Sequence, residues 1–196
     1  MKYTHLILII FLLFSCQENS TIDYQITETD QLDELSIYQL PSEWKTQYGE
    51  SIEFKNLKGK TLVVVMIYTS CKTACPRLVA DMRMIEEKVT GKKGKDIQYV
   101  LVSIDPKNDT PEKLKAFAKE NGLEDQKWLF LQGNEDDVRD FANIMSVKYK
   151  QISPIDFSHS NIISVFDKHG VMKFQKEGLG LENDEIVENI LAIAKL

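Results

Sequence analysis

The chain has 196 residues, a formal net charge of −6 and a pI near 5.2. That length suits one domain with its own hydrophobic core, so the three cysteines are not needed as a disulfide framework. The acidic balance argues against a surface that binds nucleic acid.

The first 15 residues have the layout of an export signal. Lys2 is followed by an apolar run over residues 6–14, which is too short for an ordinary transmembrane helix. Residues 13–16, Leu-Phe-Ser-Cys, resemble a bacterial lipobox that ends in Cys16. We therefore predict a lipoprotein signal peptide over residues 1–15 and lipidation at Cys16. An uncleaved anchor is the alternative, and it places the domain on the same side of the membrane, outside the cytoplasm.

Residues 16–35 are polar and acidic with little periodicity, which is typical of a flexible tether. The folded domain is expected over residues 36–196. Weak alternation over residues 37–40 and 51–54 predicts two short strands at its start.

Two cysteines lie where a predicted strand passes into a predicted helix. The strand covers residues 61–67, which are apolar and mostly β-branched. Cys71 and Cys75 follow it. The helix is indicated by apolar side chains at helical spacing, namely Leu78, Met82, Ile85 and Val89.

This position suits thiol chemistry. The positive end of the helix dipole, together with Lys72 and Arg77, predicts lowered thiol pKa values. Residues four apart lie on one helical face, so the sulfurs of Cys71 and Cys75 can share a disulfide or a soft metal ion such as Cu(I). Two thiolates alone are an incomplete metal site, and a histidine is the natural third ligand.

Strands and helices alternate through the rest of the chain. A strand over residues 97–104 precedes a helix that Thr110 and Pro111 begin and that ends near residues 121–122. The remaining predicted elements are a strand at 128–131, a helix capped by Asn134, strands at 161–166 and 171–174, and a helix at 185–195. This order predicts an α/β fold, a thioredoxin-like three-layer sandwich with a central mixed sheet.

His159 lies at the entry to the penultimate predicted strand. A thioredoxin-like layout brings that loop beside the start of the cysteine helix, so Cys71, Cys75 and His159 become a candidate three-ligand site. On composition alone a loop histidine is commonly just solvated, so the imidazole ligand is a hypothesis here. His169, beside Gly170 at a predicted hairpin tip, is interpreted as an exposed turn residue.

Three segments together resemble the Sco/SenC family of copper-binding, thioredoxin-like proteins that serve cytochrome c oxidase assembly. They are residues 64–77 with Cys-x-x-x-Cys-Pro, residues 103–114 with Asp-Pro-x-x-Asp-Thr-Pro, and residues 158–160 with His-Ser. The resemblance covers about residues 36–196, and each motif alone is weak.

The resemblance implies a membrane-anchored metallochaperone that binds Cu(I) or Cu(II). Cys71 and Cys75 would be thiolate ligands and His159 the imidazole ligand. The implied partners are the copper-site subunit of cytochrome c oxidase, or another exported cuproprotein, and a thiol reductant. Because only reduced thiols bind copper, a reversible Cys71–Cys75 disulfide would control loading.

The chain departs from the family pattern at three places. Residues 72–74 are Lys-Thr-Ala where proline and an acidic residue are usual, which adds to the expected lowering of the thiol pKa values. Ser158 replaces an aspartate and cannot supply its carboxylate beside the imidazole. Asn108 replaces an arginine, which removes an ionic contact from that loop.

The main alternative is an enzyme. An exported thiol-disulfide oxidoreductase would use Cys71 and Cys75 as nucleophile and resolving thiol and would not need His159. Three residues between the cysteines, instead of the usual two, count against it. A peroxidase that uses Thr69 and Arg77 is a weaker alternative, and a purely structural disulfide is the weakest.

Overall fold

The computed structural model describes residues 35–72, 74–92, 96–180 and 183–196. The predicted signal peptide, Cys16 and the tether up to residue 34 lie outside the described residues. Within the described ranges, none of the helices combines the length and apolarity that crossing a membrane requires.

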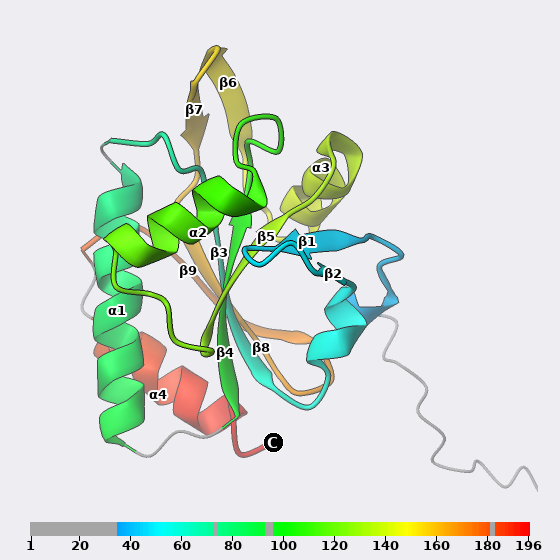
Figure 1. Cartoon of the computed structure of the whole chain (residues 1–196). Helices are drawn as coiled ribbons and strands as arrows, with labels where there is room; N and C mark the ends of the chain where they lie inside the picture. The colour runs from blue at the N-terminus through cyan, green and yellow to red at the C-terminus, as the bar shows by residue number, and fades with distance from the viewer. Residues whose placement is uncertain (1–34, 73, 93–95, 181–182) are drawn as a thin grey trace, which may run out of the picture. The chain divides into compact units, whose positions relative to one another are not determined.

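A seven-stranded mixed sheet forms the middle layer (Figure 1). The three inner strands β3 (Thr61–Ile67), β4 (Ile97–Ser103) and β5 (Trp128–Gln132) are parallel, and β3 is antiparallel to β8 (Ile162–Phe166) on its other side. Every residue of β3 is buried, which confirms the predicted central strand. The strand order is β2 (Ser51–Ile52), β1 (Trp44–Thr46), β5, β4, β3, β8 and β9 (Met172–Glu177).

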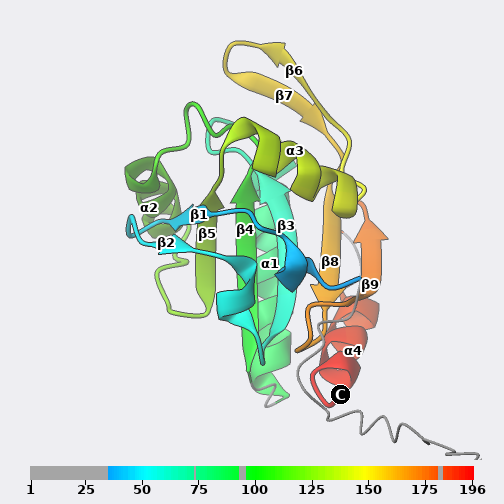
Figure 2. The same cartoon turned by 90° about the vertical axis from the view of Figure 1, so that its right-hand side faces the viewer.

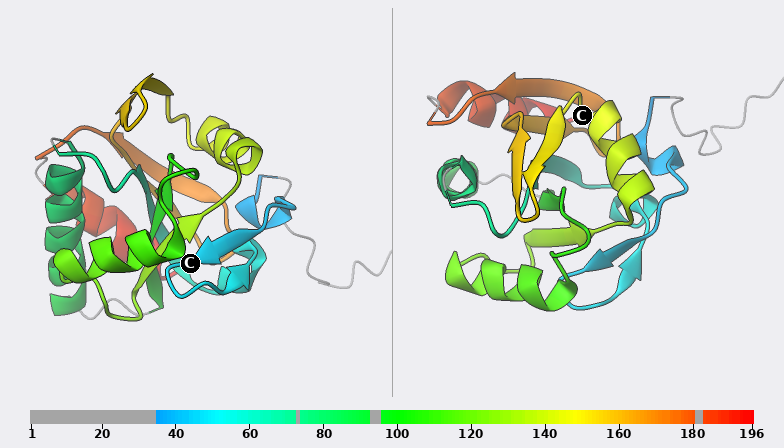
Figure 3. Two further views of the ribbon diagram at one scale, coloured as in Figure 1. Left: turned by 45° about the horizontal axis from the view of Figure 1, so that its top comes forward. Right: turned by 90° about the horizontal axis from the view of Figure 1, so that it is seen from above.

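Helices cover both faces of this sheet and complete the predicted three-layer sandwich. Seen from above, α1 (Ala74–Gly91), α2 (Pro111–Glu120) and α4 (Asp184–Ile193) lie on one face and α3 (Glu135–Ile144) lies on the other (Figure 3). The side view also places α1 and α3 on opposite faces (Figure 2).

The predicted helix signals are confirmed. The four apolar side chains that indicated α1 are all buried. Thr110 is the N-cap of α2 with Pro111 in its first turn, and the Asn134 side chain accepts hydrogen bonds from two backbone N–H groups at the start of α3. Local capping chemistry fixes where these helices begin.

The N-terminal strand predictions are only partly right. Ile37–Gln39 is a 3-10 helix (η1), because the Ser36 side chain caps it and the adjacent Ile37 and Tyr38 are both buried, which a half-buried strand does not allow. Of the predicted 51–54 strand, only Ser51–Ile52 pairs, and Phe54–Leu57 forms a second 3-10 helix (η2).

A two-stranded hairpin, β6 (Tyr149–Ser153) and β7 (Asp156–His159), forms a separate antiparallel sheet. It rises from the end of the domain at which β3 leads into α1 (Figures 1 and 2). A loop was predicted for these residues, so the hairpin is a correction to that prediction. Most of its side chains are exposed, and its sequence therefore lacks the apolar alternation of a half-buried strand.

Candidate metal centre

Both predicted cysteines lie at the junction of β3 and α1. Cys75 is in the first turn of α1, and Cys71 lies in the loop before it. Both carry reduced thiols that are not joined in a disulfide, and both are buried, with exposed fractions of 6% for Cys71 and 0% for Cys75. The backbone N–H of Cys75 donates to the Cys71 Sγ at 3.3 Å, so that sulfur sits at the helix N-terminus.

His159, the last residue of β7, brings its imidazole to the same place. Its Nε2 is 3.9 Å from the Cys75 Sγ. Its Nδ1 lies 3.0 Å from the Ser160 carbonyl oxygen, and because a carbonyl only accepts, Nδ1 carries the proton. Burial lowers the pKa of His159. The ring is therefore neutral, with the Nε2 lone pair free to face the thiols.

The three predicted ligands are neighbours, but they do not form a closed cluster. Across the residues that the structure describes, no group of three or more His, Cys, Asp or Glu side chains is arranged to hold a metal ion. Cys75 and His159 face each other, whereas the Cys71 sulfur accepts the helix N–H. Two thiols and one imidazole are nonetheless the donor types that suit Cu(I).

The predicted lowering of the thiol pKa values is wrong for Cys75. Burial raises the pKa of this thiol, because the thiolate would lose its hydration in the protein interior. The backbone hydrogen bond from Tyr68 opposes that effect without overcoming it. Lys72 and Arg77 are both exposed, and the Arg77 guanidinium lies against Gly180.

Tyr68, at the end of β3, connects the cysteine loop to the hairpin. Its hydroxyl donates to the Asp156 carboxylate at 2.5 Å and is 3.1 Å from the Phe157 carbonyl oxygen. Its ring meets the His159 ring edge-on at 5.7 Å between centroids. Beside it, the Ser70 hydroxyl donates to the Ile155 carbonyl at 2.8 Å. These contacts hold the hairpin where His159 can face Cys75.

Asp109 holds the cysteine loop in place through hydrogen bonds to Thr69. Its carboxylate accepts from the Thr69 backbone N–H at 3.1 Å, from the Thr69 hydroxyl at 2.5 Å and from the Ser103 hydroxyl at 2.6 Å. The residue is 0% exposed, and burial raises its pKa. In the same motif, the Asn108 amide donates to Asp105, so this departure from the family pattern is used for a local hydrogen bond.

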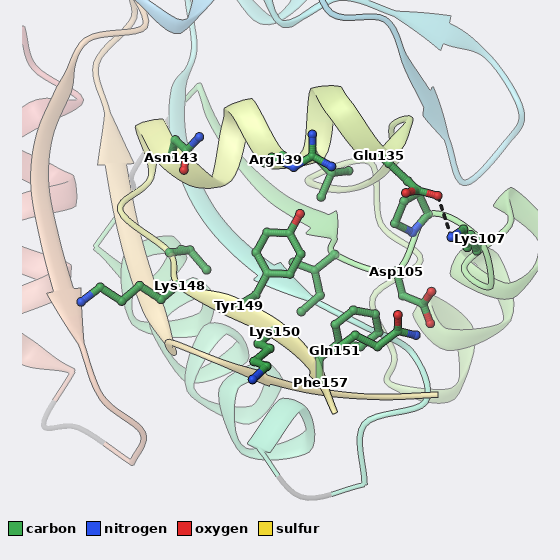
Figure 4. Close-up of a pocket in the computed structure, with 14 residues that line it drawn as sticks. Asp105, Lys107, Glu135, Arg139, Asn143, Lys148, Tyr149, Lys150, Gln151 and Phe157 are labelled. Atoms are coloured by element: carbon green, nitrogen blue, oxygen red, sulfur yellow. Dashed lines mark ion pairs between the residues drawn. The ribbon is translucent and has the colours of Figure 1, made fainter. Parts of the chain in front are cut away.

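A cavity of about 530 Å³ adjoins the site (Figure 4). It lies between α3, the hairpin and the loop after β4, and it contains the Lys107–Glu135 ion pair at 2.8 Å. Tyr149 and Phe157 line it, with ring centroids 6.5 Å apart. Cys71, Cys75 and His159 do not line this cavity, but Phe157 also touches Tyr68. Neither this cavity nor the roles of Tyr68 and Asp109 were predicted from the sequence.

A thioredoxin-like domain with a buried thiol pair at the strand–helix junction, and a neutral imidazole opposite, defines a protein of thiol redox or soft-metal chemistry. Comparison with known families specifies the class further. The chain belongs to the SCO1/SenC family, whose sequence model matches residues 32–195.

Individual relatives agree with this family. The SCO1 protein homolog of Bacillus subtilis is 27% identical over 162 residues, which cover 80% of this chain and 82% of that protein. An SCO2-like protein of Rickettsia typhi is 30% identical over 130 residues, which cover 63% and 62% of the two chains.

Solved structures agree in fold. A SCO1/SenC family lipoprotein from Bacillus anthracis has a TM-score of 0.73 and 25% identity, with 81% of this chain and 96% of that chain covered. BsSco, described with a disulfide switch and as a member of the Sco family of cytochrome c oxidase assembly proteins, has a TM-score of 0.72 and 25% identity, with 84% and 97% covered. Copper-bound Arabidopsis thaliana ScoI has a TM-score of 0.71 and 20% identity, with 80% and 97% covered.

Proposed function

We propose that this chain is a metallochaperone that carries copper to the copper site of cytochrome c oxidase. The observation that carries the proposal is the pairing of Cys75 Sγ with His159 Nε2 at 3.9 Å, beside a second thiol. Family membership supports the cargo, since a solved member of this fold holds copper and another is described as an oxidase assembly protein.

Copper is the cargo in this proposal, and the chain's own residues prepare its binding site. The thiols of Cys71 and Cys75 supply soft sulfur ligands once they have lost their protons. His159 presents Nε2 because the Ser160 carbonyl holds the proton on Nδ1. Asp109 and Tyr68 fix the loop and the hairpin that carry these ligands.

We also propose that the domain acts outside the cytoplasm, tethered to a bacterial membrane. Residues 1–15 would be removed, Cys16 would carry the lipid, and residues 16–35 would connect it to the domain at 36–196. The signal-like sequence supports this arrangement, and the Bacillus anthracis relative is described as a lipoprotein.

A copper titration of the reduced full-length protein tests the proposal, with a Cu(I) chelator as competitor. We expect stoichiometric binding that is lost or weakened at least tenfold in Cys71→Ala, Cys75→Ala and His159→Ala. His169→Ala is the matched control, because His169 lies in the turn between β8 and β9. Binding that is unaffected by His159→Ala, or absent from the wild type, contradicts the proposal.

The second candidate is a thiol-disulfide oxidoreductase. It is favoured by the two reduced thiols and by the position of Cys71 Sγ at the N-terminus of α1. One thiolate would attack a partner's disulfide, and the second would displace the reduced partner and leave a Cys71–Cys75 disulfide. Catalysed reduction of a disulfide substrate, retained in His159→Ala together with weak copper binding, would favour this function.

A further inference from the structure

The tip of the β6–β7 hairpin exposes two large apolar side chains that the fold does not use. Ile152 is 61% exposed and Ile155 is 63% exposed. They are three positions apart at the turn of a hairpin that rises from the domain (Figure 1). Neither belongs to the hydrophobic core. Two large apolar side chains exposed within four residues of each other, on an element that projects from the domain, make this tip a candidate surface for a partner.

This tip is held in place beside the cysteine loop. The Ile155 carbonyl accepts a hydrogen bond from Ser70, the residue directly before Cys71. Asp156, the next residue of the tip, accepts from the buried Tyr68. A two-stranded hairpin is marginal on its own, so these anchors give the tip a defined position. A fixed apolar surface binds a partner at a lower cost in entropy than a mobile one.

Three exposed lysines lie along the hairpin and in the cysteine loop, although the chain as a whole is acidic. Lys150 lies in β6, two positions before Ile152, whereas Lys148 lies at the base of the hairpin, where its carbonyl accepts from Ser160, and Lys72 follows Cys71. The carboxylate at the tip, Asp156, already accepts from Tyr68. Among the described residues, none of the three lysines takes part in an ion pair. Against a net charge of −6, this local set of unpaired lysines selects a partner with carboxylates around its contact surface.

The burial of the thiols determines where an acceptor of copper has to bind. Cys75 is fully buried, and His159 belongs to the hairpin itself. Copper shared between these residues lies next to the hairpin, so a protein that takes it must lie against the hairpin while its own ligands enter.

We infer that the hairpin is the docking surface for the copper-accepting protein, with Ile152 and Ile155 at its tip, Lys150 beside them, and Lys148 and Lys72 nearer to the cysteine loop. The matching surface of that protein is an apolar patch ringed by acidic side chains. This inference rests on the proposed function and adds to it the place and chemistry of the encounter.

Stopped-flow transfer of Cu(I) tests the inference. The donor is the loaded full-length protein, and the acceptor is the purified copper-site domain of the oxidase subunit. We expect Ile152→Ser/Ile155→Ser and Lys148→Glu/Lys150→Glu each to lower the second-order transfer rate at least tenfold, with copper affinity unchanged. Added salt should slow the wild type and have little effect on the lysine variant.

Matched controls come from other surfaces of the domain. Met84→Ser removes an exposed apolar side chain from α1, and Lys113→Glu/Lys119→Glu reverses two charges on α2. Both controls should transfer copper at the wild-type rate. Equal rates in the tip variants and the wild type overturn the inference.

The same variants also test two other occupants of this surface, namely a second copy of the chain and a lipid membrane. Dimerisation that the isoleucine variant abolishes, measured by sedimentation, would assign the tip to a second copy of this chain and overturn the inference. Binding to phosphatidylglycerol vesicles that is lost in the same variant would assign the tip to lipid and would also overturn the inference.

Titration calorimetry between the two metal-free proteins tests docking even if the chain binds no copper. Failure of the docking surface and failure of the proposed function are therefore distinguishable.

Discussion

The Cys75 thiol keeps its proton at neutral pH, because burial raises its pKa. A metal ion that binds there must displace that proton, whereas neutral His159 has none to lose from Nε2. The apparent copper affinity should therefore rise by about tenfold per pH unit for each thiol proton displaced, over the range below the thiol pKa values.

Competition titrations of the reduced protein between pH 6 and pH 8 measure this dependence. Calorimetry in buffers with different ionisation enthalpies counts the released protons directly. Cys75→Ala is the control, and it should release fewer protons than the wild type. An affinity that does not change with pH would show that the site already holds thiolates.

The Tyr68 hydroxyl is a second single group with a measurable effect. Tyr68→Phe keeps the ring but leaves Asp156 without its buried donor, so we expect the free energy of unfolding to fall by about 1 kcal/mol. Amide hydrogen exchange in β6 and β7 should also become faster. Urea denaturation and exchange measurements check both effects, with Tyr149→Phe as the matched control on the hairpin. Unchanged exchange in Tyr68→Phe would mean that the hydroxyl does not anchor the hairpin.

Among the elements, α3 covers one face of the sheet and depends on its first turn. The Asn134 side chain accepts from the backbone N–H groups of Asp136 and Asp137. Asn134→Ala should lower the free energy of unfolding by about 1 kcal/mol, because those groups lose their cap. Urea denaturation measures the change, and Asn143→Ala, an exposed position of the same helix, should have little effect.

The elements also show what the sequence can and cannot predict. The β3 run and the caps at Thr110 and Asn134 are strong local signals, and the predicted elements appear where they indicate. The β1 strand has only three residues, and it forms because Trp44 is fully buried in the completed fold. The hairpin lacks an alternating pattern because it packs little of its surface. Such elements depend on tertiary contacts, which no short window of sequence contains.

The site, like the fold, has features that local sequence predicts and features that depend on tertiary contacts. Motif and spacing brought Cys71, Cys75 and His159 forward as candidates, and in the structure they are neighbours, with Cys75 facing His159, although their role as metal ligands stays a prediction. The pKa of Cys75 was predicted to be lowered by the helix dipole and the nearby basic residues. It is raised because the thiol is buried, and burial at this position depends on tertiary packing. The supporting role of Asp109 was missed because it depends on contacts across 40 positions of the chain.

At the scale of the whole molecule, the proposed tether decides where the domain works. Cys16→Ser should abolish lipidation and release the protein from the membrane fraction of a bacterial host that expresses the full chain. Fractionation and mass spectrometry of the N-terminus check this, with Ser20→Ala as a control within the predicted tether. A Cys16→Ser protein that stays with the membrane would instead support an uncleaved anchor.

The facing pair Cys75 and His159 is 84 positions apart in the chain. During synthesis, Cys71 and Cys75 therefore leave the ribosome well before His159 has been translated. During that interval, the two thiols of the nascent chain are accessible to soft metal ions and to oxidants. The two sulfurs and the imidazole come together only after residue 159 has been translated and the hairpin has docked on Tyr68. If the proposed function holds, the site can therefore bind metal only late in synthesis, and a product truncated before residue 159 would keep both thiols without the imidazole.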